Sequence, residues 1–194
     1  MSRKLKVVAV SGSLQRPSKT LVLMEAILAR LKQQLAIDVH LVELSEIADQ
    51  FGGVTRHADL SARVNADLHA VENADLLIVG SPVYRASFTG LFKHFFDFVH
   101  QDALVDVPVL LAATGGSERH ALVIEHQLRP LFSFFQALTL PIGVYASDSD
   151  FSAYQIDQPA LLARIDLAVE RALPLLSHRE ASVPAIPVAA QAQH

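Results

Sequence analysis

Three short polar stretches of this sequence follow apolar runs, and their residue types suit an anion and a flat ring. The first stretch places hydroxyl and amino side chains around one glycine: Ser11, Gly12, Ser13, Ser18, Lys19 and Thr20. Hydroxyl groups and the free amides at a helix N-terminus donate hydrogen bonds, and the helix dipole favours negative charge there. We predict that this stretch binds a phosphate group. The alternative is that Ser18 only caps the helix while the other hydroxyls face water.

The second stretch, Ser81–Ser87, could hold one side of a ring. Pro82 and Val83 can offer backbone and an apolar edge, and Tyr84 can stack on a ring or close the pocket. A plain turn with a core tyrosine is the competing interpretation for Tyr84.

The third stretch is Thr114–Ser117. Gly115 and Gly116 would let backbone amides come close to a ligand, where donors stabilise negative charge that develops on reduction. The competing interpretation is a turn at the start of a helix, capped by Ser117.

The spacing of these residues departs from three common motifs. Gly12 lies one residue too far from Ser18-Lys19-Thr20 for a P-loop, and the second glycine of that motif is missing. No Gly-x-Gly-x-x-Gly follows a strand, and no Gly-x-Ser-x-Gly occurs. We therefore exclude a P-loop NTPase, a Rossmann-type dinucleotide site and an α/β-hydrolase.

Composition excludes further classes of protein. The chain has no cysteine, which rules out disulfides, thiolate nucleophiles and Cys-ligated metals. Histidines of one predicted helix, such as His120 and His126, lie six residues apart without a third ligand, so we predict no metal site. The net charge is −4 and the basic residues are scattered, which predicts no nucleic-acid partner.

The elements that must position the three stretches alternate between strands and helices. Apolar or alternating runs predict strands at Leu5–Val10, Ile37–Leu44, Leu76–Gly80, Val109–Ala113 and Ile142–Tyr145. Apolar residues at helical spacing predict helices at Lys19–Gln34, Ser61–Asn73, Phe88–Val99, Arg119–Gln136 and Pro159–Leu176. A polar connection containing Gly52 and Gly53 is expected after the second strand.

This alternation predicts an α/β fold: a three-layer, flavodoxin-like doubly wound sandwich around a five-stranded parallel sheet of order 2-1-3-4-5. Ligands of such sheets bind beyond the carboxyl ends of the strands. Because the first, third and fourth strands are neighbours in this order, the three polar stretches are expected to form one site.

The chain of 194 residues predicts one domain, at residues 1–176. Residues 177–194 are rich in Ala, Pro and Gln without a helical period, which predicts a flexible tail or an arm onto a neighbouring subunit. The apolar run near the N-terminus is too short for a signal segment or a membrane span, so we expect a cytoplasmic protein.

Taken together and in order, Gly12-Ser13 with Ser18 and Thr20, Ser81-Pro82-Val83-Tyr84, and Ala113–Ser117 resemble the NAD(P)H-dependent FMN reductase family. The resemblance spans residues 5–176 and is greatest to the FMN reductases of sulfonate-sulfur utilisation, which supply reduced flavin to a separate monooxygenase. It implies FMN and either NADH or NADPH as ligands, with hydride passing from nicotinamide C4 to flavin N5 and no side chain required as a catalytic group.

The resemblance also assigns residues to the ligand. The FMN phosphate would lie on Ser11, Ser13, Ser18, Lys19 and Thr20, and the ring between Pro82-Val83-Tyr84-Arg85 and Thr114-Gly115-Gly116-Ser117. Many members carry an arginine at the position of Gln15, whereas here the arginine is Arg16, so either side chain is a candidate for the phosphate.

The family forms dimers and tetramers, which implies a homodimer or homotetramer. Phe132, Phe134 and Phe135 could pack between subunits or simply fill the core. Sulfonate-linked relatives can also carry an inserted residue that makes a π-bulge, and His126 lies where it would fall. The competing interpretation is an ordinary helix histidine.

Two other functions stay open at this point. The protein could keep FMN bound and reduce a quinone, an azo dye or a metal ion, or it could be a flavodoxin-like electron carrier without NAD(P)H activity. The modest net charge gives little support to the carrier, because flavodoxins commonly have strongly acidic surfaces.

Overall fold

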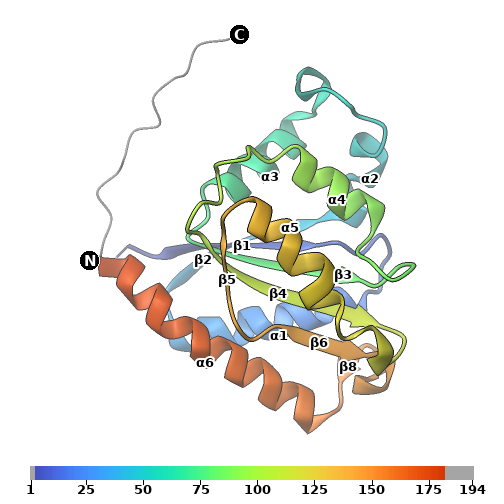
Figure 1. Cartoon of the computed structure of the whole chain (residues 1–194), viewed down its shortest axis with the longest axis vertical. Coiled ribbons are helices and arrows are strands. Elements are labelled where there is room, and N and C mark those ends of the chain that lie inside the picture. The colour runs from blue at the N-terminus through green and yellow to red at the C-terminus, as the bar shows by residue number, and fades with distance from the viewer. Residues whose placement is uncertain (1–2, 182–194) are drawn as a thin grey trace.

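Strand β1 (Leu5–Ser11) lies inside a parallel sheet, and the rest of the sheet is assembled around it. The computed structural model, which describes residues 3–181, pairs β1 with β2 (Ile37–Glu43) on one side and with β3 (Leu76–Pro82) on the other. Strand β4 (Pro108–Gly115) continues the sheet beyond β3. The order β2-β1-β3-β4-β5 confirms the predicted flavodoxin-like arrangement (Figure 1).

The fifth position of the sheet departs from the prediction of one strand at Ile142–Tyr145. It is divided between β5 (Leu138–Thr139) and β6 (Val144–Ser147), and each pairs with a different part of β4. The segment between them contains Pro141, which has no N–H to donate to a ladder. The break therefore follows from the residue types between the two strands.

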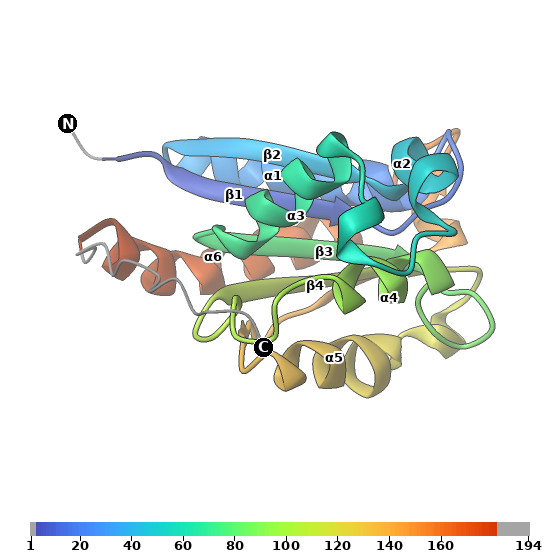
Figure 2. The same ribbon diagram turned by 90° about the horizontal axis from the view of Figure 1, so that it is seen from above.

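Helices cover both faces of the sheet (Figure 2). Helices α1 (Lys19–Gln34) and α6 (Pro159–Ala181) pack together on one face. Helices α3 (Ala62–Glu72), α4 (Gly90–Asp97) and α5 (Arg129–Phe134) lie on the other. In β1, Val7 and Ala9 join the core under α1, whereas Val8 and Val10 join the core under α4, as the period of two requires.

Side-chain caps fix where three helices begin. Ser18, Ser61 and Thr89 each accept a hydrogen bond from the amide three residues later. The predicted helix at Phe88–Val99 is therefore shorter in the structure, beginning after Thr89 and ending at Asp97.

Several elements differ from the sequence prediction. Helix α2 (Leu44–Phe51) replaces the start of the expected polar connection, with Leu44, Ile47 and Phe51 buried on one face. The expected helix at Arg119–Gln136 is divided into η2 (Glu118–His120), the π-helix η3 (Ile124–Leu128) and α5. The π-helix contains His126, so the structure has the π-bulge at this position and not the ordinary helix that was the alternative. Short elements complete the fold: η1 (His57–Asp59), η4 (Asp148–Asp150), β7 (Phe151–Ser152) and β8 (Gln155–Ile156).

Helix α6 continues past Leu176, the end of the predicted helix, to Ala181, so the first residues of the predicted tail are helical. The hydroxyl of Ser177 donates to the carbonyl of Leu173 within this helix. The remainder of the predicted tail, residues 182–194, lies outside the described residues. Among residues 3–181, no helix has both the length and the apolar character needed to span a membrane.

Candidate functional site

The loops after β1, β3 and β4 meet at one edge of the sheet, as predicted, because these strands are neighbours with parallel carboxyl ends. They enclose a cavity of about 420 Å³, a volume that suits a mononucleotide. Its lining residues are Ser13, Gln15, Pro17, Ser18, Lys19, Thr20, Pro82, Val83, Tyr84, Thr114, Gly115, Gly116, Asp148 and Tyr154.

The loop after β1 requires glycine at position 12. A Cβ on Gly12 would lie 2.8 Å from the ring of Phe92, closer than Cβ contacts in real proteins. The Gly12 amide donates to the Gly80 carbonyl over 2.7 Å, and the Thr89 hydroxyl donates to the Gly12 carbonyl over 2.9 Å. These contacts fix the chain where it leaves the sheet and enters the candidate phosphate loop.

The first turn of α1 supplies the donors of this loop. The Ser18 hydroxyl accepts from the Leu21 amide, and the free amides of the helix N-terminus lie beside the cavity. The hydroxyls of Thr20 and Thr114 are 2.6 Å apart, so one donates to the other. The accepting hydroxyl keeps its own hydrogen for a ligand.

Arg16 turns away from the cavity. Its Nε lies 2.8 Å from Glu43 Oε2, and its guanidinium also pairs with Glu46 over 3.2 Å. These carboxylates raise the pKa of Arg16, chiefly through the hydrogen bond to Glu43. Gln15 is the member of this pair of residues that lines the cavity.

The wall provided by the second stretch is apolar. The Val83 amide donates to the Thr114 carbonyl over 2.7 Å, which ties this wall to β4. A tight turn follows, closed by the Tyr84 amide donating to Ser87, with left-handed backbone at Arg85 (φ 51°) and Ala86 (φ 69°). The turn places Arg85 on the surface, outside the cavity lining.

Tyr145 on β6 supports the third stretch from behind. Its hydroxyl donates to the Ser117 carbonyl over 2.6 Å. A Cβ on Gly115 would lie 2.3 Å from the same hydroxyl, so only glycine fits here. Burial raises the pKa of Tyr145 to about 12, with Glu118, Asp148 and Asp150 adding to the rise. The hydroxyl therefore stays protonated at neutral pH and keeps donating.

Ten of the predicted site residues line one cavity: Ser13, Ser18, Lys19, Thr20, Pro82, Val83, Tyr84, Thr114, Gly115 and Gly116. Four do not line it: Ser11, Arg16, Arg85 and Ser117. Ser11 is buried at the end of β1, and Ser117 faces Tyr145 through its carbonyl.

Asp148 and Tyr154 also line the cavity, although neither lies in one of the three polar stretches. Asp148 directly follows β6, at the same edge of the sheet as the three stretches. The rule that ligands bind beyond the carboxyl ends of strands would have found it, had the last strand been given its observed end at Ser147.

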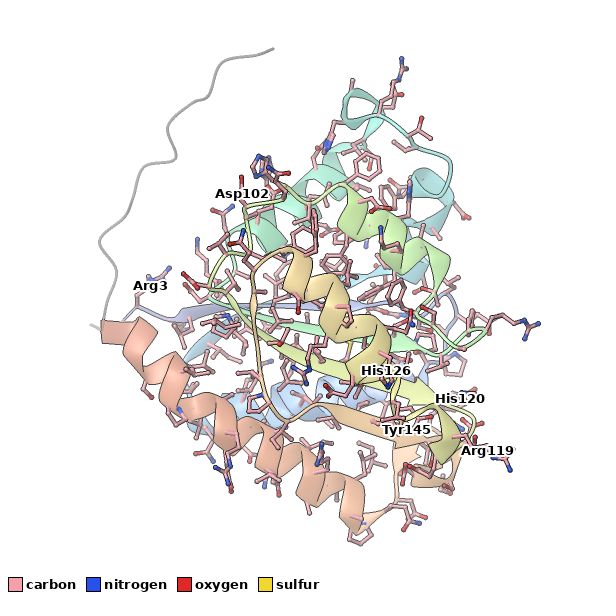
Figure 3. All side chains as sticks on the ribbon, viewed as in Figure 1. Arg3, Asp102, Arg119, His120, His126 and Tyr145 are labelled. Atoms are coloured by element: carbon pink, nitrogen blue, oxygen red, sulfur yellow. The ribbon has the colours of Figure 1, made fainter. Side chains whose placement is uncertain are left out.

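A second hollow of about 170 Å³ lies beside the first and shares Val83 with it. Arg119, His120 and His126 contribute to its wall, and Figure 3 shows these three side chains near Tyr145 at the same end of the molecule. Leu122 and Val123 add apolar side chains to its lining.

The π-helix beside this hollow is braced by an ion pair. Arg129 donates to both carboxylate oxygens of Glu125, over 2.6 and 2.8 Å, and to the Leu140 carbonyl over 3.1 Å. The hydrogen bonds from Arg129 lower the pKa of Glu125.

The chain is similar to proteins of one family. A model of the family described as NADPH-dependent FMN reductase matches residues 5–152. The NADH-dependent FMN reductase SfnF of Pseudomonas fluorescens is 62% identical over 90% of this chain and 94% of its own. An FMN reductase (NADPH) of Pseudomonas aeruginosa is 58% identical over 92% of this chain and 96% of its own. The solved structure of an oxidoreductase from Corynebacterium diphtheriae superposes with a TM-score of 0.78 at 33% identity, covering 91% of this chain and 99% of that one.

Proposed function

The chain belongs to the NADPH-dependent FMN reductase family, and we propose that FMN is its exchangeable substrate, released after reduction by a nicotinamide nucleotide. The protein is an NAD(P)H-dependent FMN oxidoreductase. The observation that carries the proposal is one cavity whose lining combines hydroxyl donors from the loop after β1 and the first turn of α1 with the apolar residues Pro82 and Val83 at the end of β3. This is the polarity of a phosphorylated ring compound.

At the phosphate end, this chain supplies neutral donors and a helix N-terminus. Ser13, Ser18 and Thr20 line the cavity beside the first turn of α1. Lys19 adds one positive charge to this end. These groups bind and orient the phosphate and need no rearrangement, because caps and backbone hydrogen bonds already hold them.

At the ring end, Pro82 and Val83 give a flat apolar wall, and Gly115 and Gly116 contribute only backbone to the facing wall. When bound, the flavin accepts a hydride at N5 from the nicotinamide ring. Backbone donors in the Gly115-Gly116 segment stabilise the negative charge that reduction creates, without a side chain acting as acid or base. The protein contributes position and charge stabilisation.

The exposure of two side chains that line the cavity supports ready exchange of FMN. Tyr84 and Tyr154 both line it, and they are 45% and 44% exposed. A ligand held between half-exposed side chains can leave without opening the core.

We propose that the second hollow receives part of the nicotinamide nucleotide. It adjoins the ring end through Val83, and Arg119 and His120 at its wall suit phosphate groups. The relatives differ in the nucleotide that their names give, NADH for one and NADPH for the other. Either nucleotide is therefore a candidate for this chain.

The proposed destination of reduced FMN is a partner flavin-dependent monooxygenase of sulfonate-sulfur metabolism in the cytoplasm. It is supported by the resemblance of the three binding stretches and by the high identity to SfnF. We also propose a homodimer or homotetramer. Phe134 is 66% exposed beside Phe135, next to a hollow that Phe96 and Leu131 help to line. An apolar surface of this kind favours contact with a second copy.

The proposal is tested by following NADH and NADPH oxidation with and without added free FMN. We expect oxidation to depend on added FMN, and reduced FMN to pass through a membrane that retains the protein. Reduction of a quinone, an azo dye or a metal ion with no release of reduced FMN would instead identify a reductase with bound flavin. Bound FMN that neither nucleotide bleaches would identify an electron carrier.

A further inference from the structure

The cavity contains one ion pair of its own. Lys19 Nζ lies 2.8 Å from Asp148 Oδ1, and both side chains line the wall at the phosphate end. Lys19 is the first residue of α1, and Asp148 is the first residue of η4, directly after β6. Among the described residues that line this cavity, Lys19 is the only cation and Asp148 the only carboxylate.

The consequence is a phosphate site without net positive charge. A phosphate monoester carries close to two negative charges at neutral pH. A group of that charge next to Lys19 also meets the carboxylate of Asp148, and like charges repel. The neutral hydroxyls and amides favour the phosphate, whereas Asp148 opposes it.

The backbone of Asp148 is held in place by the turn that begins η4. Asp150 accepts from the Ser147 amide over 2.7 Å and from the Ser147 hydroxyl over 3.0 Å, which fixes the start of η4. The Asp148 side chain is 62% exposed, so it can move without disturbing buried packing. Lys19 also lies 5.7 Å from the ring centre of Phe151, a contact that does not involve Asp148.

We propose that Asp148 sets how readily FMN leaves, by competing with the flavin phosphate for Lys19. The inference rests on the proposed function and deepens it, because an enzyme that releases reduced FMN gains from a phosphate site of limited affinity. A carboxylate that only positioned Lys19 would act in the opposite direction, since its removal would weaken phosphate binding.

The test is the binding of two flavins, FMN and riboflavin, which has no phosphate. Dissociation constants of the wild type and Asp148→Asn are measured from the quenching of flavin fluorescence. We expect Asp148→Asn to bind FMN about fivefold more tightly and to release it more slowly in stopped flow, because a partly exposed ion pair has an effect of this order. Riboflavin binding should not change.

Two control experiments separate the effect of the Lys19–Asp148 ion pair from a general effect of charge. Asp49→Asn makes the same change of charge at an exposed position of α2 outside the cavity lining and should bind both flavins as the wild type does. In a Lys19→Met background, Asp148→Asn should lose most of its effect on the dissociation constant for FMN, because Lys19 is no longer there to compete for, and a double-mutant cycle measures this coupling. Melting temperatures of all variants confirm that they fold.

The inference is overturned if Asp148→Asn binds FMN equally or more weakly, or if riboflavin binding tightens as much as FMN binding. Those outcomes leave the proposed function intact, provided that the wild type binds FMN and oxidises a nicotinamide nucleotide in its presence. A folded wild type that binds neither flavin would overturn the proposed function, and this inference with it.

Discussion

The hydroxyl groups of Thr20 and Thr114 lie 2.6 Å apart and join the first turn of α1 to the end of β4. Both residues are buried and both line the candidate cavity. The first turn of α1 belongs to the proposed phosphate site, and β4 leads into the segment proposed to face the flavin ring. This hydrogen bond therefore fixes the position of one part of the site relative to the other.

Thr20→Val should weaken the site while keeping the fold. The substitution leaves the Thr114 hydroxyl buried without this partner, at a cost of about 1–3 kcal/mol in the free energy of unfolding. We expect the dissociation constant for FMN to rise by about tenfold, corresponding to one lost donor. Denaturant titration and flavin fluorescence measure the two effects. Thr55→Val, at an exposed loop position, is the control and should change neither.

Tyr145→Phe tests the support behind the third stretch. It removes the hydrogen bond to the Ser117 carbonyl and should lower the free energy of unfolding by about 1 kcal/mol. Because the loosened segment faces the ring end, FMN and riboflavin should both bind more weakly, by similar factors. Weaker binding of FMN alone would show that Tyr145 acts on the phosphate end instead.

Gly115→Ala should be more damaging than its size implies, since the new Cβ would meet the Tyr145 hydroxyl at 2.3 Å. We expect weaker binding of both flavins and a lower melting temperature. Combining it with Tyr145→Phe removes the clashing oxygen, so the double variant should be more stable than the sum of the single effects predicts. Simple additivity in thermal melts would contradict this account.

The ion pair between Glu125 and Arg129 gives the protein a pH-dependent contribution to stability. Arg129 lowers the pKa of Glu125 below its usual value of 4.5, so the folded state favours the ionised carboxylate. The stabilisation is present above pH 4.5 and is lost as the pH falls through the lowered folded-state pKa. The stability difference between the wild type and Glu125→Gln, from urea titrations, should therefore shrink on acidification below that value. A difference that is constant with pH would refute the role of this pair.

Arg119→Ala tests where the nicotinamide nucleotide binds. Arg119 lines the second hollow but not the flavin cavity, so the KM for the nicotinamide nucleotide should rise by about fivefold to tenfold, while FMN affinity stays unchanged. Steady-state kinetics with each nucleotide measure the KM, and flavin titrations measure the affinity for FMN. An unchanged KM for both nucleotides would place them elsewhere.

Local signals in the sequence were enough for much of the fold. The buried run of β1, the spacing of apolar residues in α1 and the Ser18 cap predicted a strand, a turn and a helix with nearly the observed bounds. Helix α2 was missed because Gly52 and Gly53 indicated a connection, although Leu44, Ile47 and Phe51 share one helical face. The division of β5 from β6 depends on Pro141 and on the register against β4, which a local pattern does not show.

By itself, the sequence determined which three loops carry polar and glycine-rich residues and, through the order of strands, that these loops meet. Tertiary structure decided which side chains face the cavity. Arg16 lies in the right loop but pairs with Glu43, whereas Asp148 lies far along the chain and reaches Lys19 across the site. The physical reason is that hydrophobic periodicity records burial within one element. The direction of an ionised side chain depends on charges that other elements bring within a few ångströms.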